Sequence, residues 1–185
     1  MTDDTESKTV LVVDDKKDVV EAYSLWLSDE YNVRTATGGE EALKQLGGTD
    51  LVLLDRDMPG LSGDEVLERI REEGHPCRVA MVTAVDPDFD IIEMGFDDYV
   101  TKPVDEDDLI EVAERLLTLN DIDEALSEHF TLAQKAAALR TEKTEEELNG
   151  HDRYNEIVEK MDDMKDRIEE GIQDDELAEG IYRDI

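Results

Sequence analysis

The sequence predicts an α/β fold with a doubly wound, five-stranded parallel sheet, followed by an all-α helical hairpin or short coiled coil. Two observations predict the sheet. Short, almost wholly apolar runs alternate with segments of helical period over residues 8–119, and two of these runs, TVLVVDD and LVLLDRD, end in acids. Near-continuous apolar strands are typical of parallel sheets that are covered on both faces. A third observation predicts the helices: residues 121–185 contain no proline and no strand pattern.

The elements of the sheet follow in order along the chain. The expected strands are TVLVVD, NVRTA, LVLLD, RVAMVT and DYVTK, and the expected helices lie near residues 17–28, 39–46, 62–73, 87–94 and 105–119. Because a helix follows each strand, right-handed crossovers would place helices on both faces of one sheet. Residues 1–7, MTDDTES, are polar and acidic, and we expect them to be disordered.

Residues 120–185 are expected to form a separate helical region. Asp121 and Glu124 have the spacing of a capping box, and Gly150 is expected to end the helix that begins there. The apolar stripe of this helix consists of Ala125, Leu126, Phe130, Ala133 and Ala137. A second stripe, with the alternating spacing of a coiled-coil seam, consists of Tyr154, Ile157, Met161, Met164 and Ile168. We expect these helices to pack on each other or on a second copy of the chain, which makes a homodimer a candidate assembly.

The composition is strongly acidic. The 185 residues include 52 acids and 19 bases, a net charge of −33, and the excess is spread over both parts of the chain. Such a surface indicates a salt-rich cytoplasm, where a Debye length of about 3 Å at 1 M removes most self-repulsion; a basic partner is the alternative. The single cysteine, Cys77, excludes an intrachain disulfide. No apolar run approaches the length of a membrane span, so we expect a soluble, cytoplasmic protein without a membrane partner.

Acidic residues follow the first and third expected strands. Asp14 and Asp15 end one apolar run, and Asp55 and Asp57 follow another. The carboxyl ends of parallel strands meet at one edge of the sheet, so these acids are expected to share a cleft. Converging carboxylates repel one another and require a cation, and Mg²⁺ characteristically binds one or two carboxylates together with phosphate oxygens. For Asp14 and Asp15, helix capping is the alternative interpretation.

Two further residues complete the expected site. Lys102 follows the fifth strand, and Thr83 ends the fourth. A cation, a hydroxyl group, a metal ion and an aspartate nucleophile are the groups needed to form an acyl phosphate. Asp55 is ionised at neutral pH and therefore needs no general base.

Residues 8–119 resemble the response-regulator receiver domain. VLVVDD, LVLLDRDMPGLSG, VAMVTA and DDYVTKP match its motifs in order and spacing. The resemblance implies a flavodoxin-like sheet with strand order 2-1-3-4-5, and Asp55 as the phosphoacceptor. It also implies Asp15 and Asp55 as side-chain Mg²⁺ ligands, Asp57 as a ligand through its backbone carbonyl, and Asp14 as an acid that acts through water.

The same resemblance assigns the remaining roles. Thr83 and Lys102 would contact the phosphoryl oxygens, and Tyr99 would be the aromatic switch. A sensor histidine kinase would be the partner. The chain would assist its own phosphorylation and dephosphorylation without being an enzyme that acts on a separate substrate.

The stretch DEALSEHFTLAQKAAALRTEKTEEEL resembles the HalX domain, which occurs beside receivers in salt-loving archaea. We therefore interpret the chain as a two-component response regulator. Its signal would pass through the face formed by residues 87–94, 98–102 and 105–119 to the C-terminal helices.

Two alternatives stay open at this point. One is a DNA-binding transcriptional regulator that uses residues 120–185, although the net charge of −13 over residues 121–185 opposes contact with phosphate. The other is a phosphatase or phosphotransferase with an aspartyl-phosphate intermediate. Neither a suitably placed general acid nor a cap domain is visible in the sequence to support it.

Overall fold

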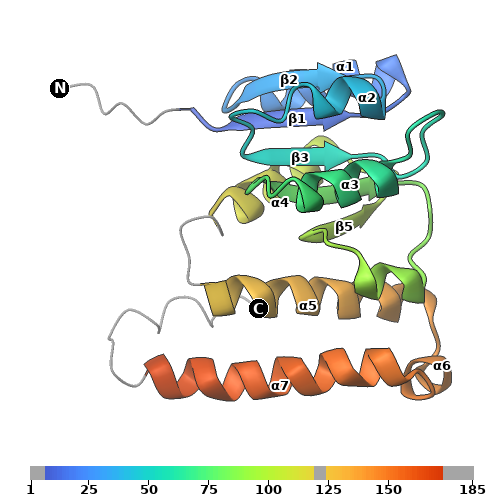
Figure 1. Cartoon of the computed structure of the whole chain (residues 1–185), viewed down its shortest axis with the longest axis vertical. Coiled ribbons are helices and arrows are strands. Elements are labelled where there is room, and N and C mark those ends of the chain that lie inside the picture. Colours follow the sequence, from blue (N-terminus) through green and yellow to red (C-terminus); the bar gives the residue numbers. More distant parts are fainter. Residues whose placement is uncertain (1–6, 119–123, 173–185) are drawn as a thin grey trace. The chain divides into compact units, whose positions relative to one another are not determined.

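The computed structural model describes residues 7–118 and 124–172 (Figure 1). The chain has two compact units, Met1–Asp121 and Ile122–Ile185. Within the described ranges, no helix combines the length and apolar character that crossing a membrane requires.

The first unit is built on one parallel sheet. Its strands are β1 (Thr9–Val13), β2 (Asn32–Ala36), β3 (Leu51–Leu54), β4 (Arg78–Thr83) and β5 (Asp98–Thr101). They pair in the order β2-β1-β3-β4-β5, and every pairing is parallel. Strand β3 is buried along its whole length, as are all of β1 and β4 except their first residues, which explains their apolar sequences. The predicted fold class and strand order are confirmed.

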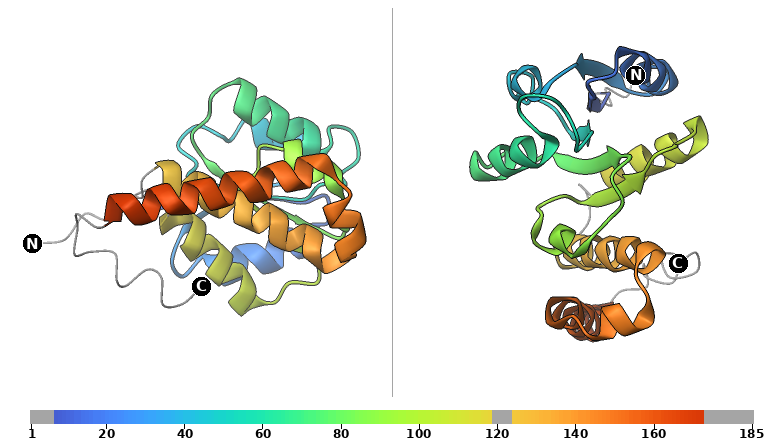
Figure 2. Two further views of the ribbon diagram at one scale, coloured as in Figure 1. Left: turned by 90° about the horizontal axis from the view of Figure 1, so that it is seen from below. Right: turned by 90° about the vertical axis from the view of Figure 1, so that its right-hand side faces the viewer.

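Helices cover both faces of this sheet (Figure 2). They are α1 (Lys17–Leu27), α2 (Gly39–Leu43), α3 (Gly63–Glu72) and α4 (Glu106–Thr118). Helices α1 and α4 pack together on one face, and α2 and α3 pack together on the other. The side chains of Ser62 and Glu65 form the capping box that begins α3.

The segment between β4 and β5 differs from the prediction. An α-helix was expected over residues 87–94, but the structure has a short 3₁₀ helix, η1 (Phe89–Glu93), which the Asp88 side chain caps by accepting a hydrogen bond from the Phe89 N–H at 2.7 Å. Ile91 is the one buried residue within η1, so no second buried turn holds a longer helix on the sheet. Helix α2 is likewise shorter than residues 39–46.

The register of the sheet aligns the ends of the strands. Val13 pairs with Leu54, and the Asp55 N–H continues the ladder by donating to the Val13 carbonyl at 2.9 Å. On the other side of the sheet, the Lys102 N–H donates to the Thr83 carbonyl at 2.8 Å. The residues that follow β1, β3 and β5 therefore lie at the same edge.

The second unit is a helical hairpin, as predicted. Its helices are α5 (Glu124–Glu142), α6 (Glu145–Asn149) and α7 (Asp152–Ile172), and α5 packs against α7. The first helix ends at Glu142 and not at Gly150, because Thr144 and Glu147 form a capping box that begins α6. The expected cap at Asp121 lies outside the described residues.

The predicted apolar stripe on α7 agrees with the observed burial better than the one on α5 does. In the predicted seam of α7, Tyr154, Ile157 and Met164 are buried, whereas Met161 is half-buried. The stripe expected on α5 is displaced: Ala137 is exposed, and Ala136 and Leu139 are buried. Side chains at positions 125 and 168 lie outside the described residues.

Gly63 offers a test of how tightly the turn after β3 packs. A Cβ at this position would lie 2.1 Å from the Asp55 carbonyl oxygen and 2.8 Å from the Arg56 Cα. Both obstacles are backbone atoms, so we expect Gly63→Ala to lower the free energy of unfolding by about 1–3 kcal/mol. Urea denaturation at constant high salt would measure this change. The matched control is Gly47→Ala, where nothing lies within 4 Å of the added Cβ; equal stabilities for the two variants would contradict the steric argument.

Candidate functional site

Three carboxylates converge at the carboxyl edge of the sheet. Asp14 and Asp15 follow β1 and Asp55 follows β3, and one oxygen of each lies within 4.8 Å of the others. Asp14 and Asp55 are only 2% and 5% exposed. Like charges so close together and so little hydrated repel one another strongly. The group therefore needs a compensating cation.

Lys102 supplies part of this compensation. Its ammonium forms an ion pair with Asp14 Oδ2, and it lies 3.5 Å from Asp55 Oδ1. The lysine side chain is 13% exposed, so it holds its charge mostly out of water. The Lys102–Pro103 peptide bond is cis.

The pKa values of these groups reflect burial and mutual charge. Burial raises the pKa of Asp55, and the adjacent Lys102 ammonium partly opposes that rise. Burial disfavours the charged form of Lys102, but the hydrogen bond to Asp14 and the charge of Asp55 outweigh burial and raise the pKa of Lys102. Lys102 is therefore a cation at neutral pH. Because Asp55 is buried, its ionised form lowers the stability of the folded state.

The acids have the properties of a site for a hard divalent cation. Among the described residues, Asp15 Oδ1 is a buried oxygen without a hydrogen-bond partner. Capping does not explain it, because the N-cap of α1 is Lys16, which makes no side-chain cap bond. Asp14 Oδ1 accepts from the Lys16 N–H at 2.8 Å in a local turn. An unpartnered buried carboxylate oxygen beside two other carboxylates fits the oxygen ligand set that Mg²⁺ prefers.

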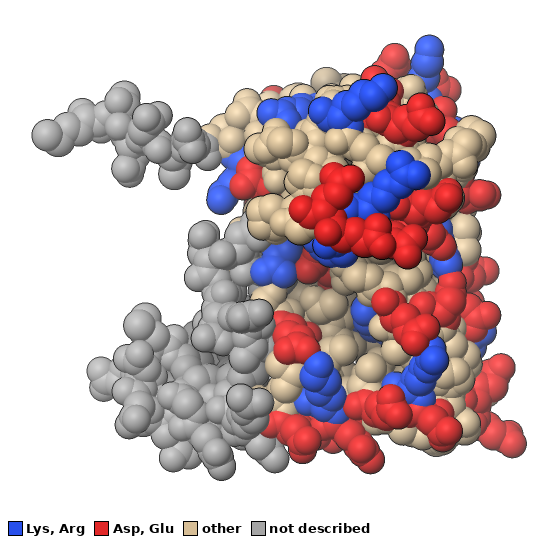
Figure 3. Space-filling view, viewed as in Figure 1, with Lys and Arg blue, Asp and Glu red and all other residues tan. Residues whose placement is uncertain are grey.

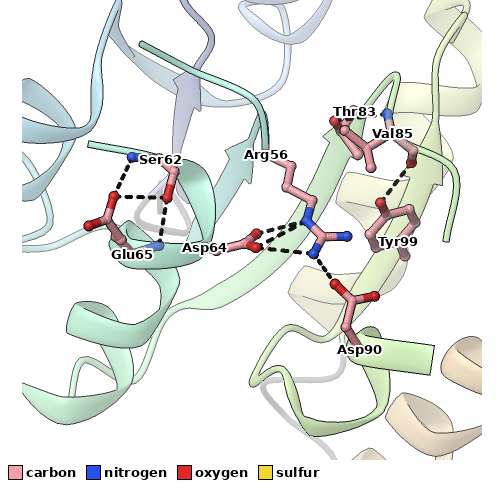
Figure 4. Close-up of polar contacts among 8 residues, drawn as sticks. All are labelled: Arg56, Ser62, Asp64, Glu65, Thr83, Val85, Asp90 and Tyr99. Carbon is pink, nitrogen blue, oxygen red and sulfur yellow. Dashed lines mark hydrogen bonds and ion pairs between the residues drawn. The ribbon is translucent and has the colours of Figure 1, made fainter. Parts of the chain in front are cut away.

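Thr83 and Tyr99 are joined through Val85 (Figure 4). Thr83 is fully buried, and its hydroxyl group lies close enough to the Asp55 carboxylate to oppose the rise that burial causes in the pKa of Asp55. The Val85 N–H donates to Thr83 Oγ1 at 3.3 Å, and the Tyr99 hydroxyl donates to the Val85 carbonyl at 2.7 Å. A continuous series of contacts thus leads from Asp55 to the ring of Tyr99.

The remaining site residue, Asp57, lies apart from the three carboxylates. Its side chain is exposed, and it does not belong to the group formed by Asp14, Asp15 and Asp55. A role for its backbone carbonyl stays a prediction.

Two residues near the site had not been singled out from the sequence. The Tyr23 hydroxyl on α1 is close enough to Lys102, Asp14 and Asp55 for their charges to influence its pKa, which burial raises. Arg56 follows Asp55 directly and reaches Asp64 and Asp90. The helical period of residues 17–28 places Tyr23 on the inner face of α1. No sequence pattern indicates the partners of Arg56.

Comparison with known proteins identifies the family. Residues 10–114 match the model of the response regulator receiver domain, and residues 118–181 match that of the HalX domain. The chain belongs to the response regulator receiver family. Both resemblances found in the sequence are confirmed.

Two relatives illustrate the match. A Haloferax volcanii protein provisionally named a transcriptional regulator is 50% identical over 141 residues, which are 75% of this chain and 24% of that protein. The alkaline phosphatase synthesis transcriptional regulatory protein PhoP of Bacillus subtilis is 42% identical over 104 residues, which are 52% of this chain and 43% of PhoP. The chain thus spans less than half the length of each relative.

Solved structures agree with this assignment. The Thermotoga maritima response regulator TrrA, solved in complex with Mg²⁺-BeF, matches with a TM-score of 0.54 and 38% identity over 59% of this chain and 98% of its own. The BeF3-activated DrrB receiver domain matches with a TM-score of 0.57 and 31% identity over 60% of this chain and 98% of its own.

The crowding of carboxylates has a measurable consequence for stability. Because burial raises the pKa of Asp55 in the folded state above its unfolded value, ionised Asp55 destabilises the fold; this cost is present above the folded pKa and disappears as the pH falls below the unfolded pKa. We expect Asp55→Asn to raise the free energy of unfolding by about 1 kcal/mol at neutral pH without divalent cations. Asp57→Asn removes the same charge from an exposed position and should change stability little. A less stable Asp55→Asn protein in chemical denaturation would contradict this account.

Proposed function

We propose that this chain is a phosphorylation-controlled response regulator in which Asp55 accepts a phosphoryl group from a sensor histidine kinase. The observation that carries the proposal is the convergence of Asp14, Asp15 and Asp55 opposite the Lys102 ammonium at one edge of the sheet. Membership of the receiver family supports it.

The chemistry assigned to Asp55 is nucleophilic. A carboxylate oxygen attacks phosphorus, the bond from phosphorus to the donor breaks, and the imidazole of the kinase leaves with the electron pair, so that an acyl phosphate is formed. Ionised Asp55 attacks without losing a proton to a base. Its raised pKa indicates that the buried carboxylate is poorly stabilised and therefore suited to react.

Lys102 and Thr83 provide the charge and hydrogen bonding for the transferred group. The Lys102 ammonium, 3.5 Å from Asp55 Oδ1, lies where negative charge from the phosphoryl oxygens would accumulate. The Thr83 hydroxyl lies near the Asp55 carboxylate and can donate to a phosphoryl oxygen after a small rotation. The Tyr99 hydroxyl donates a hydrogen bond to the Val85 carbonyl, so movement of Thr83 and Val85 would also affect the position of Tyr99.

Asp15 and Asp55, assisted by Asp14, are the side chains that would hold Mg²⁺, and the Asp57 carbonyl is the backbone ligand in this proposal. The ion would neutralise negative charge on the incoming phosphoryl group when it is bound. The chain would thus support its own phosphorylation and dephosphorylation.

We assign the second unit, α5 to α7, to output or dimerisation. On the face seen in Figure 3, acidic side chains surround scattered lysines and arginines. Residues 121–185 carry a net charge of −13, which disfavours contact with a phosphate backbone. We therefore rank signal relay or self-association above direct DNA binding, although the names of the Haloferax volcanii and Bacillus subtilis relatives describe regulators of transcription.

Phosphotransfer to Asp55 is tested most directly by substitution. With acetyl phosphate and Mg²⁺ in high salt, the wild-type protein should gain the mass of one phosphoryl group, detectable by intact-protein mass spectrometry. Asp55→Asn should abolish this gain because the amide is not nucleophilic, whereas Asp57→Asn should retain it. Undiminished labelling of the Asp55→Asn protein would rule out the assignment.

Metal binding can be measured independently of phosphorylation. The single tryptophan, Trp26, stacks on Tyr23 with ring centroids 5.3 Å apart, so its fluorescence is expected to respond when Mg²⁺ binds. We expect Asp15→Asn to weaken Mg²⁺ binding about tenfold or more, since changes even to outer-shell partners of metal ligands cost 10- to 100-fold. Asp29→Asn, at an exposed position just after α1, is the charge-matched control. Equal Mg²⁺ affinity of Asp15→Asn and wild type would remove Asp15 from the ligand set.

A further inference from the structure

The Arg56 side chain connects the site to the segment before β5. Its guanidinium binds Asp64 on α3 through two nitrogens, with Nε 2.9 Å from Oδ1 and Nη2 3.1 Å from Oδ2 (Figure 4). The same Nη2 also forms an ion pair with Asp90 on η1. The Arg56 side chain is only 13% exposed, whereas those of Asp64 and Asp90 are 44% and 51% exposed. One cation that is nearly removed from water thus joins two different elements.

The Asp64 end of this arrangement is held firmly. The Gly63 N–H donates to the Arg56 carbonyl at 2.9 Å, and Gly63 packs directly on the backbone of Asp55 and Arg56. Asp64 lies in the first turn of α3, where a negative charge is also favoured by the helix dipole. The bidentate pair with Asp64 orients the planar guanidinium and directs Nη2 toward Asp90.

The Asp90 end lies on the short helix η1. Helix η1 is a 3₁₀ helix of five residues, and Ile91 is its one buried residue. Burial raises the pKa of Tyr99, and the nearby Arg56 guanidinium opposes that rise. The same guanidinium therefore binds η1 through Asp90 and lies near Tyr99, the residue proposed as the aromatic switch.

We propose that Arg56 is a positioning residue whose ion pair with Asp90 holds η1 and Tyr99 in the arrangement seen in the unphosphorylated protein. The inference rests on the proposed function of Asp55. If Thr83 moves toward a phosphoryl group, Val85 must follow through its bond to Thr83 Oγ1, and the Tyr99–Val85 hydrogen bond is then disturbed. Residues 88–93 come shortly after Val85 in the chain, so they must adjust as well, and the Arg56–Asp90 pair resists this adjustment.

An interaction made only in the resting arrangement opposes any ligand that favours the other arrangement. Removal of the Asp90 charge should therefore strengthen binding of a phosphoryl analogue. Because Asp90 is half exposed, its ion pair is of moderate strength, and we expect the effect to be about two- to fivefold in affinity.

The experiment measures binding of beryllofluoride to the full chain in the presence of Mg²⁺, followed by Trp26 fluorescence. Asp90→Asn should bind the analogue about two- to fivefold more tightly than wild type. Hydrogen exchange of the amides of residues 89–94 should also be faster in this variant without the analogue. Asp86→Asn is the matched control, because Asp86 is an exposed acid in the same connection.

A double-mutant cycle with Arg56→Gln identifies the partner. If the pair is responsible, Asp90→Asn should have no further effect on affinity once Arg56 has been replaced. If Arg56→Gln does not fold, the comparison of Asp90→Asn with Asp86→Asn still shows whether the charge of Asp90 specifically weakens analogue binding.

Three results would overturn this role for Arg56: unchanged or weaker analogue binding by Asp90→Asn, equal strengthening by Asp86→Asn, or independent effects in the cycle. Lower stability of Asp90→Asn without a change in analogue affinity would make the pair purely structural and would also overturn it. Failure of folded wild-type protein to bind beryllofluoride would instead overturn the proposed function of the site. The two failures are therefore distinguishable.

Discussion

The parallel pairing of β1 with β3 is the constraint on which the site depends. Because Val13 and Leu54 are partners in the ladder, the residues that follow them emerge side by side, and three carboxylates meet with little access to water. The Lys102 ammonium, carried by the residue after β5, lies among them. A sheet with any other register would separate these charges, and neither a cation site nor a reactive carboxylate would result.

The charges of the site are connected to elements far along the chain. From Asp55, contacts lead through Thr83 and Val85 to Tyr99, and Arg56 reaches Asp90 from the neighbouring position. The first route passes through Val85, in the segment between β4 and β5, and ends at Tyr99 on β5. The second ends within that segment, at Asp90 on η1. Buried charges that are linked to such a segment form an arrangement in which a local change in charge can alter another surface.

Sequence reasoning succeeded where patterns were long and locally consistent. The apolar strands and the strand order carried over from the receiver resemblance are present in the structure, and three residues of the predicted α7 seam are buried. Sequence reasoning failed in two short segments: residues 89–93 form the 3₁₀ helix η1 and not an α-helix, and the helix expected to continue to Gly150 ends at Glu142. The Thr144–Glu147 capping box that causes this break was visible in the sequence but had not been used.

By itself, the sequence determined which residues are buried in strands and which polar residues follow them, because a period of two or of 3.6 and the position of a charge after an apolar run are local properties. The tertiary structure alone decided that Lys102 pairs with Asp14 more closely than with Asp55, and that Arg56 binds Asp64 and Asp90. These partners are 8 to 88 residues apart in the chain. Their contact depends on how the strands and helices pack in three dimensions, which no local pattern records.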